Sequence, residues 1–160
     1  MLGSLARWLR FFGFDAEFCG PELDDGEVAN LARSANRWLV TRDRELASVG
    51  PRSILLRSEE LDDQLVELFH RLGLSPKADL AASRCGECNG VLEAAGPDEV
   101  RELVPPYVLR TAERFRRCAR CGRIYWPGTH TAKILDTMMT VVSRLSDRSV
   151  APSRRGKMTP

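Results

Sequence analysis

The sequence predicts an α/β fold with a mostly parallel sheet, followed by a small cysteine-rich unit and a final helix. Helix-like and strand-like patterns alternate along residues 2–74, which is typical of strands joined by helical connections. The segment "RWLVT" at 37–41 is a continuous apolar run, as expected of a strand covered on both faces. Two C-x-x-C pairs follow, separated by 29 residues. A chain of 160 residues, 43% hydrophobic and 29% charged, is expected to form one globular domain or two small ones.

The first elements are two helices with a strand between them. Apolar residues at helical spacing predict a helix over 2–12, and Gly13 stands where a C-terminal cap belongs. The segment "FDAEFC" at 14–19 predicts a short strand. A second helix is predicted over 21–36, with an acidic first turn and a small apolar face.

The next elements complete the predicted α/β unit. The apolar strand at 37–41 is followed by a loop or short helix at 42–50 and by a further strand at 52–57. An amphipathic helix is predicted over 58–74. The expected organisation is a first domain over 1–76, a loop-rich cysteine domain with short strands over 84–130, a helix over 131–146 and a disordered tail over 147–160.

Composition also bears on the compartment and the partner. No apolar run approaches the roughly 20 residues that span a bilayer, and the N-terminus lacks the features of a signal peptide, so we expect a cytoplasmic location. Residues 1–80 hold 10 basic and 14 acidic side chains, whereas residues 81–160 hold 14 basic and 8 acidic ones. The basic half suits a polyanionic partner, although an ordinary solvated surface explains the same asymmetry.

The paired cysteines predict a metal site. Two C-x-x-C turns that face each other place four thiolates around one ion, and the spacing is that of a zinc ribbon. Iron and a redox dithiol are the rival interpretations. Four thiolates leave no open coordination position, so the zinc is expected to be structural. The ligands would be Cys85, Cys88, Cys118 and Cys121, whereas Cys19 is expected to be a small buried residue.

Acidic residues follow predicted strands in the first half. Asp25 lies at a helix start, and Asp43 and Glu45 come directly after the strand at 37–41. Ligands of open parallel sheets bind beyond the carboxyl ends of the strands, so these carboxylates are expected at one rim, where they could hold Mg²⁺ or Mn²⁺. The alternative is that they cap helices.

The second half combines arginines with aromatic residues. Guanidinium groups neutralise phosphates and aromatic rings stack on bases, which predicts a surface for single-stranded RNA. Tyr125 and Trp126 could equally form the small core of the ribbon, and His130 could have a structural role. The candidate RNA-binding residues are Arg42, Arg117, Arg120, Arg123, Tyr125, Trp126 and His130.

Six segments occur here in one order: "MLGSLARWLRFFGFD", "DDGEVANLA", "WLVTRDREL", "DDQLVEL", "RCGECNGVLE" and "FRRCARCGRIYWPGTH". Together they resemble the Mut-seven C-terminal RNase domain family, in which a PIN-like, three-layer nuclease domain is fused to a zinc ribbon. The resemblance covers about residues 1–132. It implies a metal-dependent ribonuclease in which Asp25, Asp43 and the neighbouring Glu45 ligate the divalent ions.

The sequence departs from the family pattern at one point. That pattern begins with a short strand ending in an aspartate, placed directly before the "MLG" motif, and neither precedes Met1 here. We therefore expect Met1 to be an internal methionine of a longer natural chain. An alternative function for a chain without that aspartate is a non-catalytic module in which the ribbon binds RNA or protein.

Overall fold

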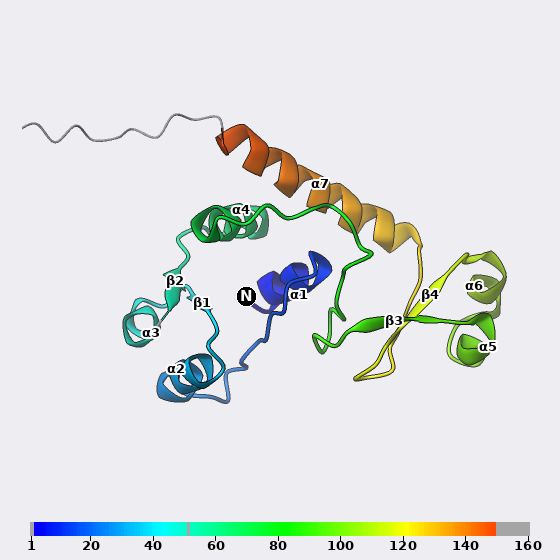
Figure 1. Ribbon diagram of the computed structural model, residues 1–160, viewed down its shortest axis with the longest axis horizontal. Helices are drawn as coiled ribbons and strands as arrows, with labels where there is room; N and C mark the ends of the chain where they lie inside the picture. The colour runs from blue at the N-terminus through cyan, green and yellow to red at the C-terminus, as the bar shows by residue number, and fades with distance from the viewer. Residues whose placement is uncertain (1, 51, 150–160) are drawn as a thin grey trace, which may run out of the picture.

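The computed structural model describes residues 2–50 and 52–149, with the side chains described through Asp147. Figure 1 shows a helix-rich first half, a small sheet at the opposite end, and a long final helix that runs from one to the other. In chain order the elements are α1 (Leu2–Phe11), α2 (Asp25–Ser34), β1 (Leu39–Thr41), α3 (Arg44–Val49), β2 (Ser53–Leu55), α4 (Leu61–Leu72), β3 (Leu92–Ala95), α5 (Pro97–Val100), α6 (Pro106–Thr111), β4 (Phe115–Cys118), β5 (Ile124–Tyr125) and α7 (Thr129–Ser149).

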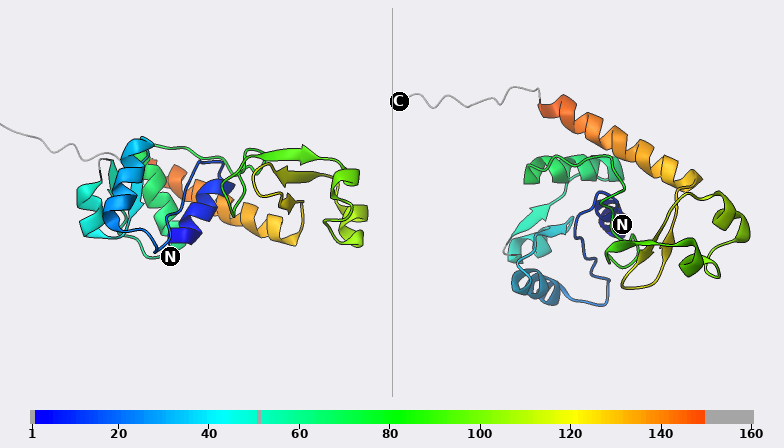
Figure 2. Two further views of the ribbon diagram at one scale, coloured as in Figure 1. Left: turned by 90° about the horizontal axis from the view of Figure 1, so that it is seen from below. Right: turned by 45° about the vertical axis from the view of Figure 1, so that its right-hand side comes forward.

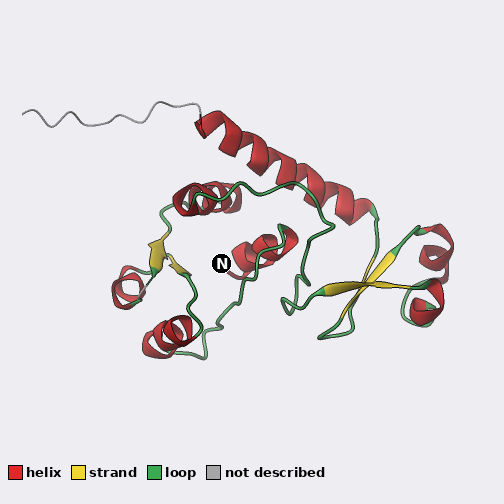
Figure 3. Cartoon of the chain, viewed as in Figure 1, coloured by secondary structure: helices red, strands yellow, loops and turns green. Residues whose placement is uncertain are grey.

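The first half contains a parallel pair of strands. Strands β1 and β2 are three residues each, are joined through α3, and pair in register with Val40 opposite Ile54. Figure 3 shows how short these strands are among the surrounding helices and loops. The predicted α/β class with a parallel sheet is confirmed, at this small size.

The strand expected at 14–19 does not form, and this part of the prediction is wrong. Residues 14–20 have no regular structure and pair with none of the strands that the structure describes. Side chains hold this backbone instead: Arg10 Nε donates to the carbonyl of Ala16 at 2.7 Å, and the N–H of Ala16 donates to Asn89 Oδ1 at 3.3 Å. A strand needs a hydrogen-bonded neighbour, and this segment has none among the described residues.

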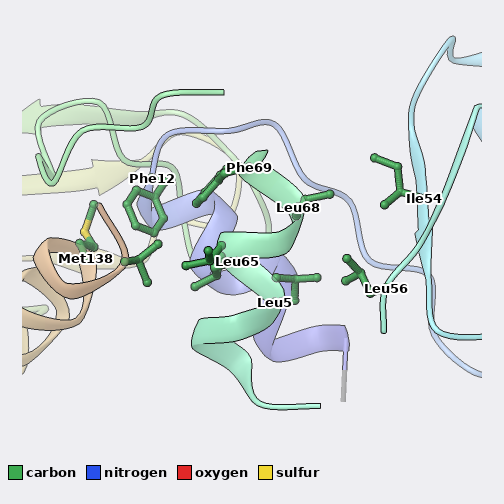
Figure 4. Close-up of a cluster of buried hydrophobic side chains, with 10 residues drawn as sticks. Leu5, Phe12, Ile54, Leu56, Leu65, Leu68, Phe69 and Met138 are labelled. Carbon is green, nitrogen blue, oxygen red and sulfur yellow. The ribbon is translucent and has the colours of Figure 1, made fainter. Parts of the chain in front are cut away.

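The main core lies between α1, α4 and α7. Leu5 in α1 and Phe12, which follows the helix directly, pack against Leu65 and Phe69 of α4. Met138 of α7 completes the cluster (Figure 4). The rings of Phe12 and Phe69 meet edge to face with centroids 5.1 Å apart. Burying each such side chain stabilises the fold by about 1.5–3 kcal/mol. The C-terminal helix therefore belongs to the core of the first half.

Helix α7 is longer than the sequence predicts. It begins at Thr129 and continues to Ser149, three residues beyond the expected end at 146. Arg144 pairs with Asp63 at the start of α4, which anchors the C-terminal part of α7 to the first half. Residues 150–160 of the expected disordered tail lie outside the described residues.

The second half is an antiparallel sheet in the order β3-β4-β5. Two short helices, α5 and α6, stand between β3 and β4, and the sequence patterns did not predict them (Figure 2). Each begins with a proline, which suits the first turn of a helix because the missing N–H has no partner there. They bury a second core of Val100, Val104, Val108 and Phe115.

Candidate functional site

The four predicted cysteine ligands come together. Across the described residues, they are the one group of three or more His, Cys, Asp or Glu side chains whose ligand atoms all lie within 4.8 Å of one another. The sulfurs of Cys85 and Cys121 are 3.7 Å apart, and those of Cys88 and Cys118 are 3.4 Å apart. Tetrahedral zinc with Zn–S bonds of about 2.3 Å needs sulfurs roughly 3.8 Å apart. The site can hold a metal ion with the size and ligand preference of zinc.

Two similar turns present these sulfurs. The residue after the second cysteine of each pair has a left-handed backbone, with φ of 64° at Asn89 and 74° at Gly122. Asparagine and glycine are the residues that adopt this conformation most readily. Gly90 is required for a different reason: a Cβ there would lie 2.7 Å from the sulfur of Cys118. The sequence "CNG" is therefore built around the metal site.

The surroundings of Cys85 favour the thiolate. This sulfur is fully buried, and the hydroxyl of Tyr125 lies 3.1 Å from it. Burial acts to raise the pKa of the Cys85 thiol, but hydrogen bonds from Tyr125 and from backbone N–H groups of the turn outweigh it and lower the pKa to about 6. The thiolate is the form that binds metal. Tyr125 thus supports the site from within the ribbon.

The first cysteine turn is attached to the acidic half by buried polar contacts. Arg10, only 6% exposed, donates to the carbonyls of Gly86 at 2.9 Å and Glu87 at 3.1 Å. Asn89, only 3% exposed, donates from its amide to Asp15 at 2.6 Å and to Glu17 at 3.1 Å. Hydrogen bonds from Arg37 and Asn89 lower the pKa of Asp15. The first cysteine turn, which carries Cys85 and Cys88 and is called the metal turn below, is therefore positioned together with residues 14–17.

The predicted acidic residues lie at helix starts. Asp43 is the N-cap of α3, and its Oδ1 accepts from the N–H groups of Glu45 at 2.7 Å and Leu46 at 3.1 Å. Asp24, not Asp25, caps α2, through a capping box with Glu27. Asp25 is the first residue of α2 and is exposed, and it lines a groove that also borders the end of β1.

These carboxylates do not form a closed ligand set. Within the part of the chain that the structure describes, Asp25, Asp43 and Glu45 do not belong to a group of three or more side chains that could hold one metal ion. All three are exposed.

The candidate RNA-binding residues divide into two groups. Arg42 pairs with Glu59 at 3.0 Å, and Arg120 donates to the Cys88 carbonyl at 2.9 Å and lies 3.7 Å from Glu17. These two arginines therefore have contacts within the protein. Arg117, Arg123, Trp126 and His130 are exposed, as is Arg120 despite its contacts, while Tyr125 is half-buried against Cys85.

Two buried polar residues, Arg10 and Asn89, are not among the site residues that the sequence predicted. The partners that join these two residues to the other half of the chain lie more than 70 residues away in sequence, and no local pattern reports such contacts. The available signal was the doubled turn itself, in which Asn89 occupies the same place as Gly122.

Comparison with known proteins gives one match. The family model described as the Mut7-C RNAse domain matches residues 1–138, which confirms the resemblance that the sequence motifs carry. No curated protein and no solved structure matches the chain. Among the described residues, none of the helices has the length and apolar content that crossing a membrane requires.

Proposed function

The chain belongs to the Mut7-C RNase domain family, and we propose that it is a metal-dependent ribonuclease of the PIN-like type that hydrolyses single-stranded RNA. The family match is the observation that carries this proposal, because an RNase domain implies RNA as the substrate. A cytoplasmic setting fits the proposal, since a reducing compartment keeps the four cysteines available to a metal.

The proposed reaction centre is the exposed acidic rim. Asp25, Asp43 and Glu45 would contribute carboxylate oxygens to bound Mg²⁺ or Mn²⁺, with water and RNA phosphates as the other ligands. Such an ion activates water and neutralises phosphate charge in phosphodiester hydrolysis. The Oδ1 of Asp43 accepts from two backbone N–H groups, which orients this carboxylate.

The proposed RNA surface lies on the ribbon. Arg117 and Arg123 supply exposed positive charge, and Trp126, 36% exposed, offers a ring face on which a base can stack. Arg42, Arg120, Tyr125 and His130 are proposed to border this surface. Residues 1–76 would form the nuclease domain, 84–130 the zinc ribbon, and the helix at 131–146 would complete the nuclease core through Met138 and Val141.

The proposed zinc has a structural role. Cys85, Cys88, Cys118 and Cys121 would hold it, and the ion would keep the sheet β3-β4-β5 folded. Through Arg10 and Asn89, the folded turn would also fix residues 14–17 of the nuclease half.

The second candidate is a binding module that recognises RNA without cleaving it. The open arrangement of the three carboxylates favours this alternative. Labelled single-stranded RNA, incubated with the zinc-loaded protein in the presence and absence of Mn²⁺, separates the two. We expect cleavage that requires Mn²⁺, and binding that weakens as salt rises because arginines contact phosphates. Salt-sensitive binding without cleavage at any Mn²⁺ concentration would establish the binding module instead.

A further inference from the structure

A polar cleft of about 450 Å³ opens on the sheet of the second half. Its walls come from β3, α5, β4 and the turn that follows β4. This volume falls within the range of about 300–1,000 Å³ that is typical of small-molecule sites. Figure 1 and Figure 2 show the sheet at the end of the molecule opposite α3. The cleft therefore lies away from the proposed acidic rim.

The charged side chains of the cleft balance one another, because two are arginines and two are glutamates. Two of the four are held within the protein: Glu99 Oε2 accepts from the Gly96 N–H at 2.6 Å, and Arg120 Nη1 donates to the Cys88 carbonyl at 2.9 Å. A site for phosphate alone would carry an excess of positive charge. The balance suits a neutral ligand that has both hydrogen-bond donors and acceptors.

The other two charged residues, Glu93 and Arg117, stand directly opposite each other on β3 and β4. Opposite charges in this position stabilise a sheet when they pair. Across the described residues, however, neither side chain has an ion-pair partner. The Arg117 guanidinium lies against Gly122 instead, where a Cβ would be 3.7 Å from Nη2 and 3.9 Å from Nε. A carboxylate and a guanidinium at the cleft are thus both available to a ligand.

We propose that this cleft recognises an unstacked guanine base of single-stranded RNA, an inference that rests on the proposed RNA substrate. Guanine presents two neighbouring donors, N1–H and N2–H, which the Glu93 carboxylate accepts. It also presents O6 and N7, the acceptor pair that arginine binds with two hydrogen bonds, and Arg117 is the donor. Proteins that bind single-stranded RNA read splayed bases along these two edges.

The carboxylate is the group that selects guanine over the other bases. Adenine and cytosine place one amino group beside an acceptor nitrogen, and uracil places one N–H between two carbonyl oxygens. Against any of these edges, one oxygen of Glu93 would face a lone pair without a proton between them. Such a repulsive contact discriminates between ligands as effectively as a favourable one.

The test measures binding of three fluorescein-labelled RNA pentamers to the zinc-loaded 160-residue chain by fluorescence anisotropy. The pentamers are UUGUU, UUAUU and UUIUU, in which inosine lacks only the N2 amino group of guanine. No Mg²⁺ or Mn²⁺ is added, so binding is measured apart from cleavage. We expect UUGUU to bind at least about tenfold more tightly than either of the others, within the discrimination that one bidentate contact provides.

Two matched variants locate the contact. Glu93→Gln should weaken binding of UUGUU about tenfold and should not weaken binding of UUAUU, because Glu93 contacts only the guanine edge. Glu102→Gln removes the same charge from an exposed side chain outside the cleft and should leave the preference unchanged. Arg117→Lys keeps the positive charge but loses the planar pair of donors, so it should reduce the preference for guanine.

The outcomes separate this inference from the proposed function. Equal binding of the three pentamers would overturn guanine recognition and leave RNA binding in place. Absence of binding by all three at about 1 mM would count against the RNA substrate and overturn both. A preference that survives Glu93→Gln would overturn the assignment to this cleft. Displacement by free GMP as effective as that by unlabelled UUGUU would make the nucleotide, not RNA, the ligand.

Discussion

Replacing Asn89 by alanine tests the joint between the metal turn and the acidic half. Asn89 donates to two carboxylates, of Asp15 and Glu17, and accepts from the Ala16 N–H and the Arg84 Nε at 3.3 and 3.0 Å. A hydrogen bond to a charged group contributes about 1.5–3 kcal/mol when buried. Both carboxylates are about half exposed, at 50% and 49%, so water recovers much of that energy and we take about 1 kcal/mol for each bond.

The backbone adds a second contribution. At φ 64° an alanine is strained by about 1 kcal/mol, whereas glycine is not. We therefore expect Asn89→Ala to lower the free energy of unfolding by about 3 kcal/mol and Asn89→Gly by about 2 kcal/mol. For a chain of this length, 3 kcal/mol corresponds to a fall in Tm of roughly 6–12 °C.

The assay is urea unfolding of the zinc-loaded variants at equal zinc content, followed by circular dichroism. The glycine variant isolates the lost side-chain contacts, and the difference between the two variants isolates the backbone strain. If both variants unfold within about 0.5 kcal/mol of the wild type, which is ordinary for a surface substitution, Asn89 does not join the two halves and the reasoning fails.

Three further predictions concern the metal, the core and pH. Removing zinc with a chelator should unfold the sheet β3-β4-β5, because structural zinc supplies about 10–16 kcal/mol of folding energy. Helices α1 and α4 should stay helical, since they share a separate core. Unchanged amide NMR signals in a zinc-free sample would refute this prediction. Phe69→Ala should lower stability by about 3–5 kcal/mol in urea unfolding, since the ring is fully buried; a loss under ~1 kcal/mol would place Phe69 outside the core. Burial acts to raise the pKa of Glu67, but hydrogen bonds from Ser58 and Arg57 outweigh this effect and lower the pKa. The ionised Glu67 therefore stabilises the fold above about pH 4.3, and this stabilisation is lost as pH falls through the folded-state pKa. Tm measured from pH 6 to pH 3 should accordingly fall less in Glu67→Gln than in the wild type, and parallel curves would contradict the assignment.

The sequence predicted those parts of the structure that depend on local patterns. The cysteine spacing predicted four sulfurs in one cluster, and the helical periodicity of 58–74 predicted α4. The acidic first turn of 21–36 predicted a helix start. The residue that caps this helix is Asp24, whereas Asp25, the candidate metal ligand, is the first residue of the helix.

Features that depend on distant partners were not predictable. The segment 14–19 has strand-like composition but pairs with no strand in the described part of the chain, so it stays irregular. Arg10 and Asn89 have ordinary surface residue types, and only the folded chain shows that both are buried. Helices α5 and α6 are too short for apolar periodicity to reveal, and the core they share with Phe115 is what stabilises them.

The most direct test of the proposed ribonuclease compares Asp43→Asn with Asp98→Asn. Asparagine caps helices about as well as aspartate, so Asp43→Asn removes the charge from the rim while keeping the start of α3 intact. Asp98 lies in the first turn of α5, is exposed at 88% and lies outside the proposed site, and it serves as the control.

The measurement is the Mn²⁺-dependent rate of single-stranded RNA cleavage at equal zinc content. We predict a fall of at least about tenfold for Asp43→Asn, ~1.4 kcal/mol of transition-state stabilisation, with Asp98→Asn unchanged. Equal cleavage by wild type, Asp43→Asn and Asp98→Asn would show that the reaction does not take place at the acidic rim.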